Sequence, residues 1–271
     1  MNFGNCLIAS AALCGTAAFL LMGRNGHKDL PKLRGWNYAH RGLHGEGRPE
    51  NSMSAFRAAL DRGYGIELDI HLLKDGNLAV IHDSLLKRTT GAEGKIEDLT
   101  TEELTQYRLE GTEETIPTFR QVLDLFAGKA PLIVELKPEG GNHAALCQAA
   151  CDMLDTYEGL FCLESFDPRC IRWLKKNRPD LIRGQLTDYF VGKANNLNPA
   201  LAFLLSHNML NFLGRPDFVA YRYSCRGKTP TNWVCEKVLG MQAVTWTLKS
   251  QEEHDDALSD NLIPIFEDYL P

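Results

Sequence analysis

The sequence predicts an α/β protein, a TIM (β/α)8 barrel with one additional strand. After residue 35, short apolar runs typical of β-strands alternate with amphipathic runs typical of helices. Such alternation implies parallel strands with the helices packed outside the sheet. A doubly wound sheet fits the same alternation, but the chain has no GxGxxG sequence of the kind that marks a dinucleotide site.

The first 22 residues carry no charged side chain. The run from residue 3 to 22 has about the 20 residues that a helix needs to cross roughly 30 Å of hydrocarbon. Basic residues begin at Arg24, after this run, so the positive-inside rule places the following domain in the cytoplasm. We expect residues 1–24 to be a membrane anchor. A cleaved signal peptide is the alternative, although the run lacks a basic n-region and a convincing A-x-A site.

The barrel is expected to occupy residues 35–271. Its strand candidates are short runs of apolar residues, at 36–40, 65–70, 78–83, 131–137, 160–166, 182–186, 218–224, 242–248 and 263–268. The helix candidates lie between most of them, at 52–62, 118–128, 142–157, 168–178, 199–210, 229–239 and 251–258. The alternation is interrupted at about 71–116, where two short strands flank "LKDGN" and "TTEEL" offers a helix cap. We expect a small insertion there, after the second barrel strand.

Composition excludes some classes of function. The 29 basic and 35 acidic residues give a net charge of -6, which argues against a protein that grips nucleic acid through a broad basic face. The eight cysteines form no CxxC pair, so they are expected to be free thiols in a reducing compartment.

Paired charges stand at the ends of two strand candidates. Glu67 and Asp69 are two residues apart, so both carboxylates project to the same side of the strand. Their repulsion in a barrel interior is costly unless a cation or a proton lies between them. Glu135 and Lys137 repeat the pattern and offer a third carboxylate. Ligation by oxygen alone favours Mg²⁺ or Ca²⁺ over zinc, although each pair taken singly is equally typical of a solvated strand edge.

Two histidines follow strand-like runs. His40 opens the glycine-rich loop "HRGLHGEGRPENS", and His82 follows "LAVI". A neutral imidazole accepts or donates a proton near pH 7, which suits a pair of histidines to general base and general acid work. His44, His71 and His143 are expected to be structural instead.

The ordered series "HRG", "PEN", "ELD", "KDG", "IHD", "RTTG", "IPT", "ELK", "ESF" and "WTL" resembles the glycerophosphodiester phosphodiesterase family from Trp36 to Pro271. Members hydrolyse glycerophosphodiesters to sn-glycerol 3-phosphate and an alcohol, on a TIM barrel with an insertion after the second strand. By matching positions, the resemblance implies a role for seven residues. The acid and base are His40 and His82, the cation ligands are Glu67, Asp69 and Glu135, and the phosphate-facing residues are Arg41 and Lys137.

Four more residues are expected to contact substrate or support the site. Asn51 is expected to orient His40 or a phosphate oxygen, and Glu50 to bind the metal or glycerol hydroxyls. Phe166 and Trp246 are candidates for an apolar wall beside the glycerol or the alcohol, with core packing as the alternative. The departures from the family, among them "IFEDYLP" for the usual "ITDxP", touch none of the proposed ligands or the histidine pair.

Three functions remain compatible with the sequence. The first is a membrane-anchored, metal-dependent phosphodiesterase for small glycerophosphodiesters, which needs no nucleic-acid partner. The second is a lysophospholipase D that takes lysophospholipids from the membrane, for which a long apolar groove beside the site would be evidence. The third is a membrane-anchored barrel that binds without turnover, which the two proton-transfer groups argue against.

Overall fold

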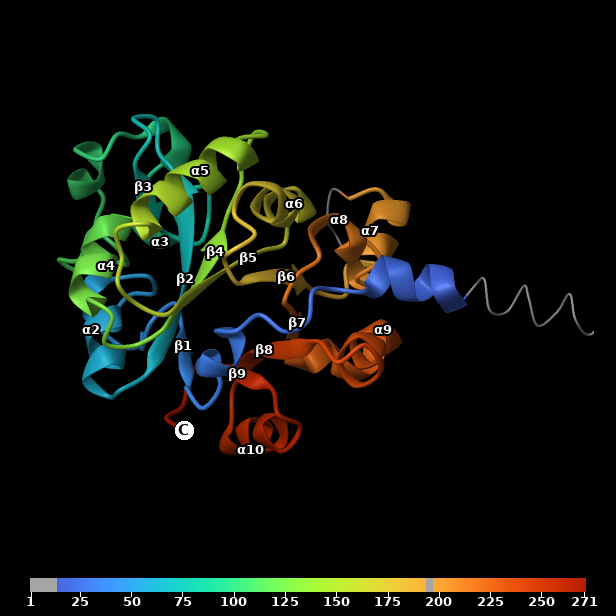
Figure 1. The fold of residues 1–271 in the computed structure, drawn as a ribbon. Coiled ribbons are helices and arrows are strands. Elements are labelled where there is room, and N and C mark those ends of the chain that lie inside the picture. The colour runs from blue at the N-terminus through green and yellow to red at the C-terminus, as the bar shows by residue number, and fades with distance from the viewer. Residues whose placement is uncertain (1–13, 194–196) are drawn as a thin grey trace, which may run out of the picture.

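Eight parallel strands close into a barrel in the computed structural model of this chain, which describes residues 14–193 and 197–271 (Figure 1). The barrel strands are β1 (Tyr38–His40), β2 (Gly65–Leu72), β4 (Leu132–Leu136), β5 (Phe161–Ser165), β6 (Arg183–Thr187), β7 (Phe218–Arg222), β8 (Gln242–Leu248) and β9 (Ile263–Phe266). Because β1 pairs in parallel with both β2 and β9, the sheet has no free edge among these strands. The predicted barrel is confirmed, and the doubly wound sheet is excluded.

Helices lie outside the barrel and follow most of its strands (Figure 1). They are α2 (Met53–Asp61), α4 (Phe119–Phe126), α5 (His143–Leu154), α6 (Pro168–Asn177), α7 (Pro199–Ser206), α8 (Asn211–Gly214), α9 (Pro230–Trp233) and α10 (Gln251–Ser259). Short turns of other helix types are η1 (Leu30–Leu33), η4 (Tyr223–Lys228) and η5 (Val234–Val238). Side-chain hydrogen bonds cap the N-termini of several of these helices. Thr118 and Gln121, for example, form a complete capping box before α4, which satisfies backbone groups that the helix leaves unpaired.

The alternation of side chains along the strands explains where the polar residues lie. In β4, Leu132, Val134 and Leu136 pack outward in the main apolar cluster, whereas Ile133 belongs to the separate cluster inside the barrel. Glu135 has the same parity as Ile133 and therefore projects inward, one step nearer the carboxyl end. The side chains inside the barrel are thus apolar toward the amino ends of the strands and acidic at their carboxyl ends, where the catalytic residues of this fold lie.

The segment between β2 and α4 departs from the barrel repeat. β3 (Leu78–Val80) runs antiparallel to β2, and α3 (Lys87–Thr90), η2 (Ile96–Asp98) and η3 (Glu103–Gln106) follow. These elements enclose a small apolar core of their own, formed by Leu73, Ala79, Ile81, Leu86, Ile96, Leu99, Leu104, Leu109 and Ile116. β2 continues through His71 and Leu72, two residues beyond the predicted strand, before the chain turns.

The start of the described chain packs on the barrel beside α8 (Figure 1). Residues 14–21 are helical, and Asn211 donates a hydrogen bond of 3.0 Å to the carbonyl of Leu21. Arg24 then forms an ion pair of 2.6 Å with the fully buried carboxylate of Asp217. Within the described residues, no helix combines the length and the apolar character needed to cross a membrane. The predicted anchor, residues 1–24, falls largely on residues 1–13, which lie outside the described part.

Candidate active site

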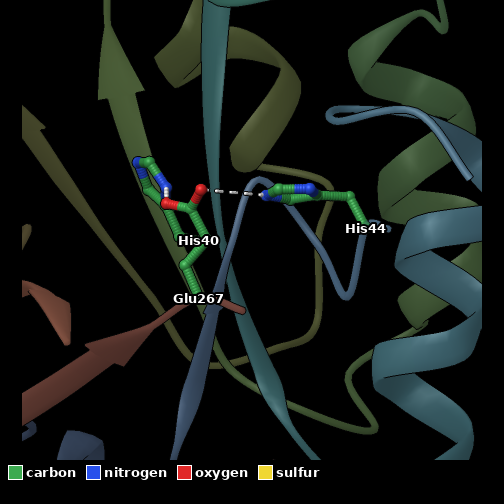
Figure 2. A group of neighbouring side chains, drawn as sticks. All are labelled: His40, His44 and Glu267. Atoms are coloured by element: carbon green, nitrogen blue, oxygen red, sulfur yellow. Dashed lines mark hydrogen bonds and ion pairs between the residues drawn. The ribbon is translucent and has the colours of Figure 1, made fainter. Parts of the chain in front are cut away.

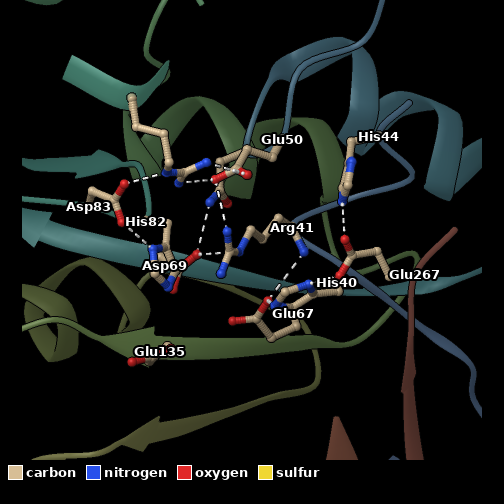
Figure 3. Close-up of polar contacts among 12 residues, drawn as sticks. His40, Arg41, His44, Glu50, Glu67, Asp69, His82, Asp83, Glu135 and Glu267 are labelled. Atoms are coloured by element: carbon tan, nitrogen blue, oxygen red, sulfur yellow. Dashed lines mark hydrogen bonds and ion pairs between the residues drawn. The ribbon is translucent and has the colours of Figure 1, made fainter. Parts of the chain in front are cut away.

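Three inward-facing carboxylates meet at the carboxyl end of the barrel (Figure 3). Glu67 and Asp69 project from β2 and Glu135 from β4, and an oxygen atom of each lies within 4.8 Å of the other two. The register places Asp69 directly opposite Glu135 on the neighbouring strand. The structure therefore brings the three predicted metal ligands together, and all three are buried. Glu67, Asp69 and Glu135 are called the acidic group.

Three polar side chains surround Asp69. Lys137 lies 3.3 Å from its Oδ1, Arg41 Nε lies 3.6 Å from its Oδ2, and Asn51 donates to Oδ2 at 2.9 Å. Burial acts to raise the pKa of Asp69. The pKa nevertheless lies well below its usual value, because the charges of Lys137, His82 and Arg41 and the hydrogen bond from Asn51 favour the ionised carboxylate. Asp69 therefore stays ionised. Asn51 donates to this carboxylate and not to His40, so the orienting contact predicted for His40 is not present.

The other two carboxylates have the opposite tendency. Burial, with the negative charges of Asp69 and Glu135, raises the pKa of Glu67 well above its usual value. Burial also raises the pKa of Glu135 to about 7, with Asp69 adding to the shift and Lys137 opposing it. The group is short of positive charge in this state, because one lysine and one arginine face three acids.

The two predicted catalytic histidines lie on the same cavity as Glu67 and Glu135. His40 is the last residue of β1, and its Nε2 lies 3.9 Å from Oε2 of Glu67. His82 follows β3 on the insertion, and its Nδ1 lies 2.6 Å from Oδ1 of Asp83. Burial lowers the pKa of His40 and lowers that of His82 to about 4, so both imidazoles are neutral near pH 7.

Glu50 is engaged by two arginines and stands apart from the acidic group. Arg41 Nη1 donates to Glu50 Oε1 at 3.0 Å, and Arg88 donates to both Glu50 oxygens at 2.7 and 2.9 Å. Arg88 also donates to Asp83, which holds His82. The network ties the first loop to the insertion. Glu50 therefore orients Arg41 in this structure and lies outside the group of Glu67, Asp69 and Glu135. Its other predicted role, contact with the glycerol hydroxyls, stays a prediction.

Phe166 and Trp246 form one wall of the cavity. Their rings meet edge to face with centroids 5.7 Å apart, and the guanidinium of Arg222 lies 4.8 Å from the Trp246 ring centroid. Both aromatic residues are only partly buried. They line the cavity and also pack against the barrel's inner cluster, and their contact with the glycerol or the alcohol stays a prediction.

The structure adds residues that the sequence did not single out. Glu164 lies beside Glu135 in the register, lines the cavity, and has a buried oxygen without a hydrogen-bond partner. The sequence contains a signal for Glu164, because "LFCLES" places an acid near the end of an apolar strand, as "PLIVEL" does for Glu135. Asp188 and Arg222 line the far side of the cavity and pair at 3.1 Å. Glu267, which follows β9, contacts His40.

The comparisons with known proteins agree with this geometry. A sequence model of the glycerophosphoryl diester phosphodiesterase family matches residues 40–270. The chain belongs to this family. The match covers the barrel, the insertion and every site residue named above, and it confirms the resemblance found in the sequence.

Individual members of the family show how far the likeness extends. A glycerophosphodiester phosphodiesterase of Bacillus altitudinis is 43% identical over 107 residues, and one of Caldanaerobacter subterraneus is 35% identical over 158 residues. These alignments cover 37% and 55% of this chain, and 43% and 65% of the relatives' own lengths. The structure of an Oleispira antarctica phosphodiesterase in complex with the product sn-glycerol-3-phosphate superposes with a TM-score of 0.71 at 22% identity, over 91% of this chain and 96% of the other.

The acidic group of this family member fits a divalent cation. Its donors are all oxygen atoms, which hard cations prefer, and Oδ1 of Asp69 is buried without a hydrogen-bond partner. A cation would supply the positive charge whose lack raises the pKa of Glu67 and Glu135. Glu67, Asp69 and Glu135 are thus the residues that can hold it.

The chelated protein is expected to lose stability as pH rises from 5 to 7.5. The pKa of Glu135 is raised to about 7 in the fold from 4.5, so its stabilising effect is complete below pH 4.5 and is lost as pH passes 7. This shift corresponds to about 3 kcal/mol in the free energy of unfolding. Because the lowered pKa of His82 changes stability in the opposite direction over this range, the effect of Glu135 is measured against Glu135→Gln, whose Tm in EDTA should fall about 5 °C less between pH 5 and pH 7.5 than that of wild type. Excess Ca²⁺ or Mg²⁺ at pH 7.5 should raise the Tm of wild type, and an equal change of Tm with pH in the two proteins would contradict the shift.

Proposed function

We propose that the chain hydrolyses glycerophosphodiesters to sn-glycerol 3-phosphate and an alcohol, with one Mg²⁺ or Ca²⁺ ion bound. One observation carries the proposal. The three acids, the two histidines and Arg41 gather at one cavity at the carboxyl end of a barrel whose family is named for this reaction. A barrel that only binds ligands has no need of two neutral imidazoles beside an acidic group.

Arg41 and Lys137 are assigned to binding of the phosphate. Arg41 lines the cavity, and Lys137 lies on the same acidic group at 3.1 Å from Glu135. Burial opposes the charge of Lys137, but Glu135 and Asp69 raise its pKa above the usual value, so the ammonium stays protonated. Both cations stabilise negative charge that spreads over the phosphate oxygens as the reaction proceeds. A bound cation would act on the same oxygens as a Lewis acid.

The histidines are assigned complementary proton transfers. His40 takes the proton of the attacking oxygen, which belongs to water or to the neighbouring glycerol hydroxyl. In the second case the hydroxyl forms a cyclic phosphate as the alcohol leaves, and water then opens the ring to give glycerol 3-phosphate. His82 donates a proton to the oxygen of the leaving alcohol. The negative phosphodiester raises the pKa of a histidine beside it, which opposes the lowering by burial and lets His82 hold a proton in the complex.

Turnover by the full chain tests the proposal. The protein is purified in detergent and treated with EDTA, and release of glycerol 3-phosphate from glycerophosphocholine and glycerophosphoethanolamine is followed as Mg²⁺ or Ca²⁺ is added. Release that requires one of the cations is expected. Absence of release with either cation, from a protein whose Tm responds to that cation, would contradict the proposed activity.

A second candidate substrate is a lysophospholipid, favoured by an apolar groove that begins at Phe166. The groove is lined by Phe166, Asp167, Pro168, Arg169, Phe190, Leu197, Leu201 and Leu205. The ring of Phe166 contacts that of Phe190 at 6.0 Å and also lines the catalytic cavity, so the two spaces share this wall. An acyl chain esterified to the glycerol would lie along α7 while the phosphate stays at the acidic group.

Substitution in the groove separates the two substrates. Leu201→Glu is expected to lower kcat/KM for lysophosphatidylcholine about tenfold relative to glycerophosphocholine, because a charge in the groove opposes burial of the acyl chain. Leu258→Glu on α10 is the matched control, since Leu258 is similarly exposed and lies outside the groove. If the ratio of the two kcat/KM values were unchanged in Leu201→Glu, the groove would not bind the acyl chain.

Membrane attachment through the N-terminal run remains a proposal, with the barrel on the cytoplasmic side. Its support is the absence of charge from residue 1 to 22 and the basic residues that follow. In the described part, Arg215 donates to the carbonyls of Phe19 and Met22, which holds the end of this run beside α8. The neighbouring α7 exposes Leu201 and Phe203. A lipid surface reached by the run would therefore lie near the groove.

A further inference from the structure

The carboxylate of Glu267 lies against His40 at the seam where the barrel closes. β1 and β9 pair with Ala39 opposite Phe266, so His40 and Glu267 are the next residues on the two strands. Oε2 of Glu267 lies 2.8 Å from Nδ1 of His40 (Figure 2). The backbone N–H of Glu267 donates to Leu248 on β8 at 2.9 Å, which fixes the residue between its neighbours. The contact follows from the topology of the barrel.

The second oxygen of Glu267 lies near His44 and Lys249, beyond hydrogen-bond distance of either. Oε1 lies 3.8 Å from Nε2 of His44 and 3.8 Å from Nζ of Lys249. The hydrogen bond with His40 lowers the pKa of Glu267 to about 2, against the opposing effect of burial. Glu267 is therefore a carboxylate that only accepts hydrogen bonds, and at 2.8 Å the shared proton must come from Nδ1 of His40.

We infer that Glu267 is a positioning residue, which keeps the proton of neutral His40 on Nδ1 and so leaves Nε2 as the acceptor that faces the cavity. A neutral imidazole carries one N–H, and the hydrogen bond made by one nitrogen decides the state of the other. The free Nε2 is the atom 3.9 Å from Glu67, beside the acidic group. The inference deepens the proposed function, because it rests on His40 as the base of that reaction.

The same three side chains have another possible use. Ligand atoms of His40, His44 and Glu267 lie within 4.8 Å of one another, a grouping that can also hold a metal ion. Binding of an ion there would require Nδ1 of His40 to lose its proton and the 2.8 Å hydrogen bond to be replaced. The two uses predict different states of Nδ1, so one measurement separates them.

Glu267→Gln tests the inference in the full chain, because the amide keeps the size of the side chain and changes what it offers to His40. Its oxygen is expected to stay on the side of Lys249, because Oε1 of Glu267 lies 3.8 Å from Nζ of that lysine, so its NH₂ group donates to Nδ1 and selects the opposite tautomer with the proton on Nε2. We expect kcat for glycerophosphocholine to fall about 100-fold, in the range of a lost general base. KM should stay within about twofold, since Glu267 does not line the substrate cavity.

Asp268→Asn is the matched control. Asp268 is adjacent in the chain and binds the same lysine, with its Oδ2 2.8 Å from Nζ of Lys249, but it has no contact with His40 among the described interactions. The substitution removes the same charge from the same end of β9. It should leave kcat within about twofold of wild type, which separates loss of charge from loss of the contact with His40.

The tautomer itself is measured by ¹⁵N NMR of the chelated protein labelled at histidine. The chain has eight histidines, and the signals of His40 are identified by their loss in His40→Ala. Wild type and Asp268→Asn should carry the proton on Nδ1, and Glu267→Gln should carry it on Nε2. This readout needs no turnover, so it stands even if the proposed reaction fails.

Three results would overturn the inference. The first is a wild-type His40 with its proton on Nε2. The second is a Glu267→Gln variant that carries the proton of His40 on Nε2 and yet retains the wild-type kcat. The third is loss of the Nδ1 proton when Zn²⁺ or Ca²⁺ is added in stoichiometric amount, which would make the three side chains a metal site instead.

Discussion

Replacement of His82 by alanine is expected to lower kcat on glycerophosphocholine by about 1,000-fold, within the range for a lost general acid. His82 lies on the cavity with Glu67 and Glu135, and Asp83 holds its Nδ1 at 2.6 Å, so the other nitrogen is the one available to a leaving group. The choline alkoxide that leaves is a strong base and needs a proton as the bond breaks. Steady-state kinetics at saturating cation measure the loss.

A substrate with an acidic leaving group distinguishes a general acid from a structural role. The p-nitrophenyl diester of glycerol 3-phosphate releases a phenolate that needs no proton, so His82→Ala should slow it only about tenfold, well below the loss expected for a missing general acid. His143→Ala, at the start of α5, should leave both substrates unaffected. Equal losses on the two substrates would show that His82 supports the site without donating the proton.

The sequence predicted the barrel well because its signals are local. Each of the nine β-strands of the described chain falls within a predicted strand or extends it by one or two residues, since most are short apolar runs between helical segments. The spacing of Glu67 and Asp69 also predicted correctly that both carboxylates share a side, because alternation along a strand is fixed by its backbone. Their meeting with Glu135 depends on the register of β2 and β4, which follows from the fold and not from either segment alone.

Contacts between segments far apart in the chain could not be predicted from the sequence. Glu267 and His40 are separated by 227 positions and become neighbours only because β9 closes the barrel against β1. The departure "IFEDYLP" was expected to leave the histidine pair untouched, and the structure shows this to be wrong, because its Glu267 contacts His40. The partners of Glu50 and Asn51 in this structure, Arg41 with Arg88 and Asp69, were not predicted, since side-chain direction in the loop is set by the left-handed backbone of Arg41 and Asn51. Their contacts with substrate stay predictions.

Replacement of Asp69 by asparagine is expected to abolish cation binding and to lower kcat by at least about 1,000-fold, as the loss of several kcal/mol of charge stabilisation implies. Asp69 is the acid that stays ionised, and Lys137, Arg41 and Asn51 all contact it. Asparagine keeps the size of the side chain and one oxygen, so the hydrogen bond from Asn51 can persist. Calorimetric titration with Ca²⁺ and Mg²⁺, beside turnover, measures both effects.

Asp61→Asn is the control, because Asp61 is an exposed carboxylate at the end of α2 and lies outside the acidic group. It should bind the cation and turn over substrate as wild type does. In Asp69→Asn the cation should also fail to raise the Tm at pH 7.5, because Glu67 and Glu135 alone provide too little negative charge. If Asp69→Asn bound the cation normally but lost activity, the ion would lie elsewhere, and the group of His40, His44 and Glu267 would be the next place to test.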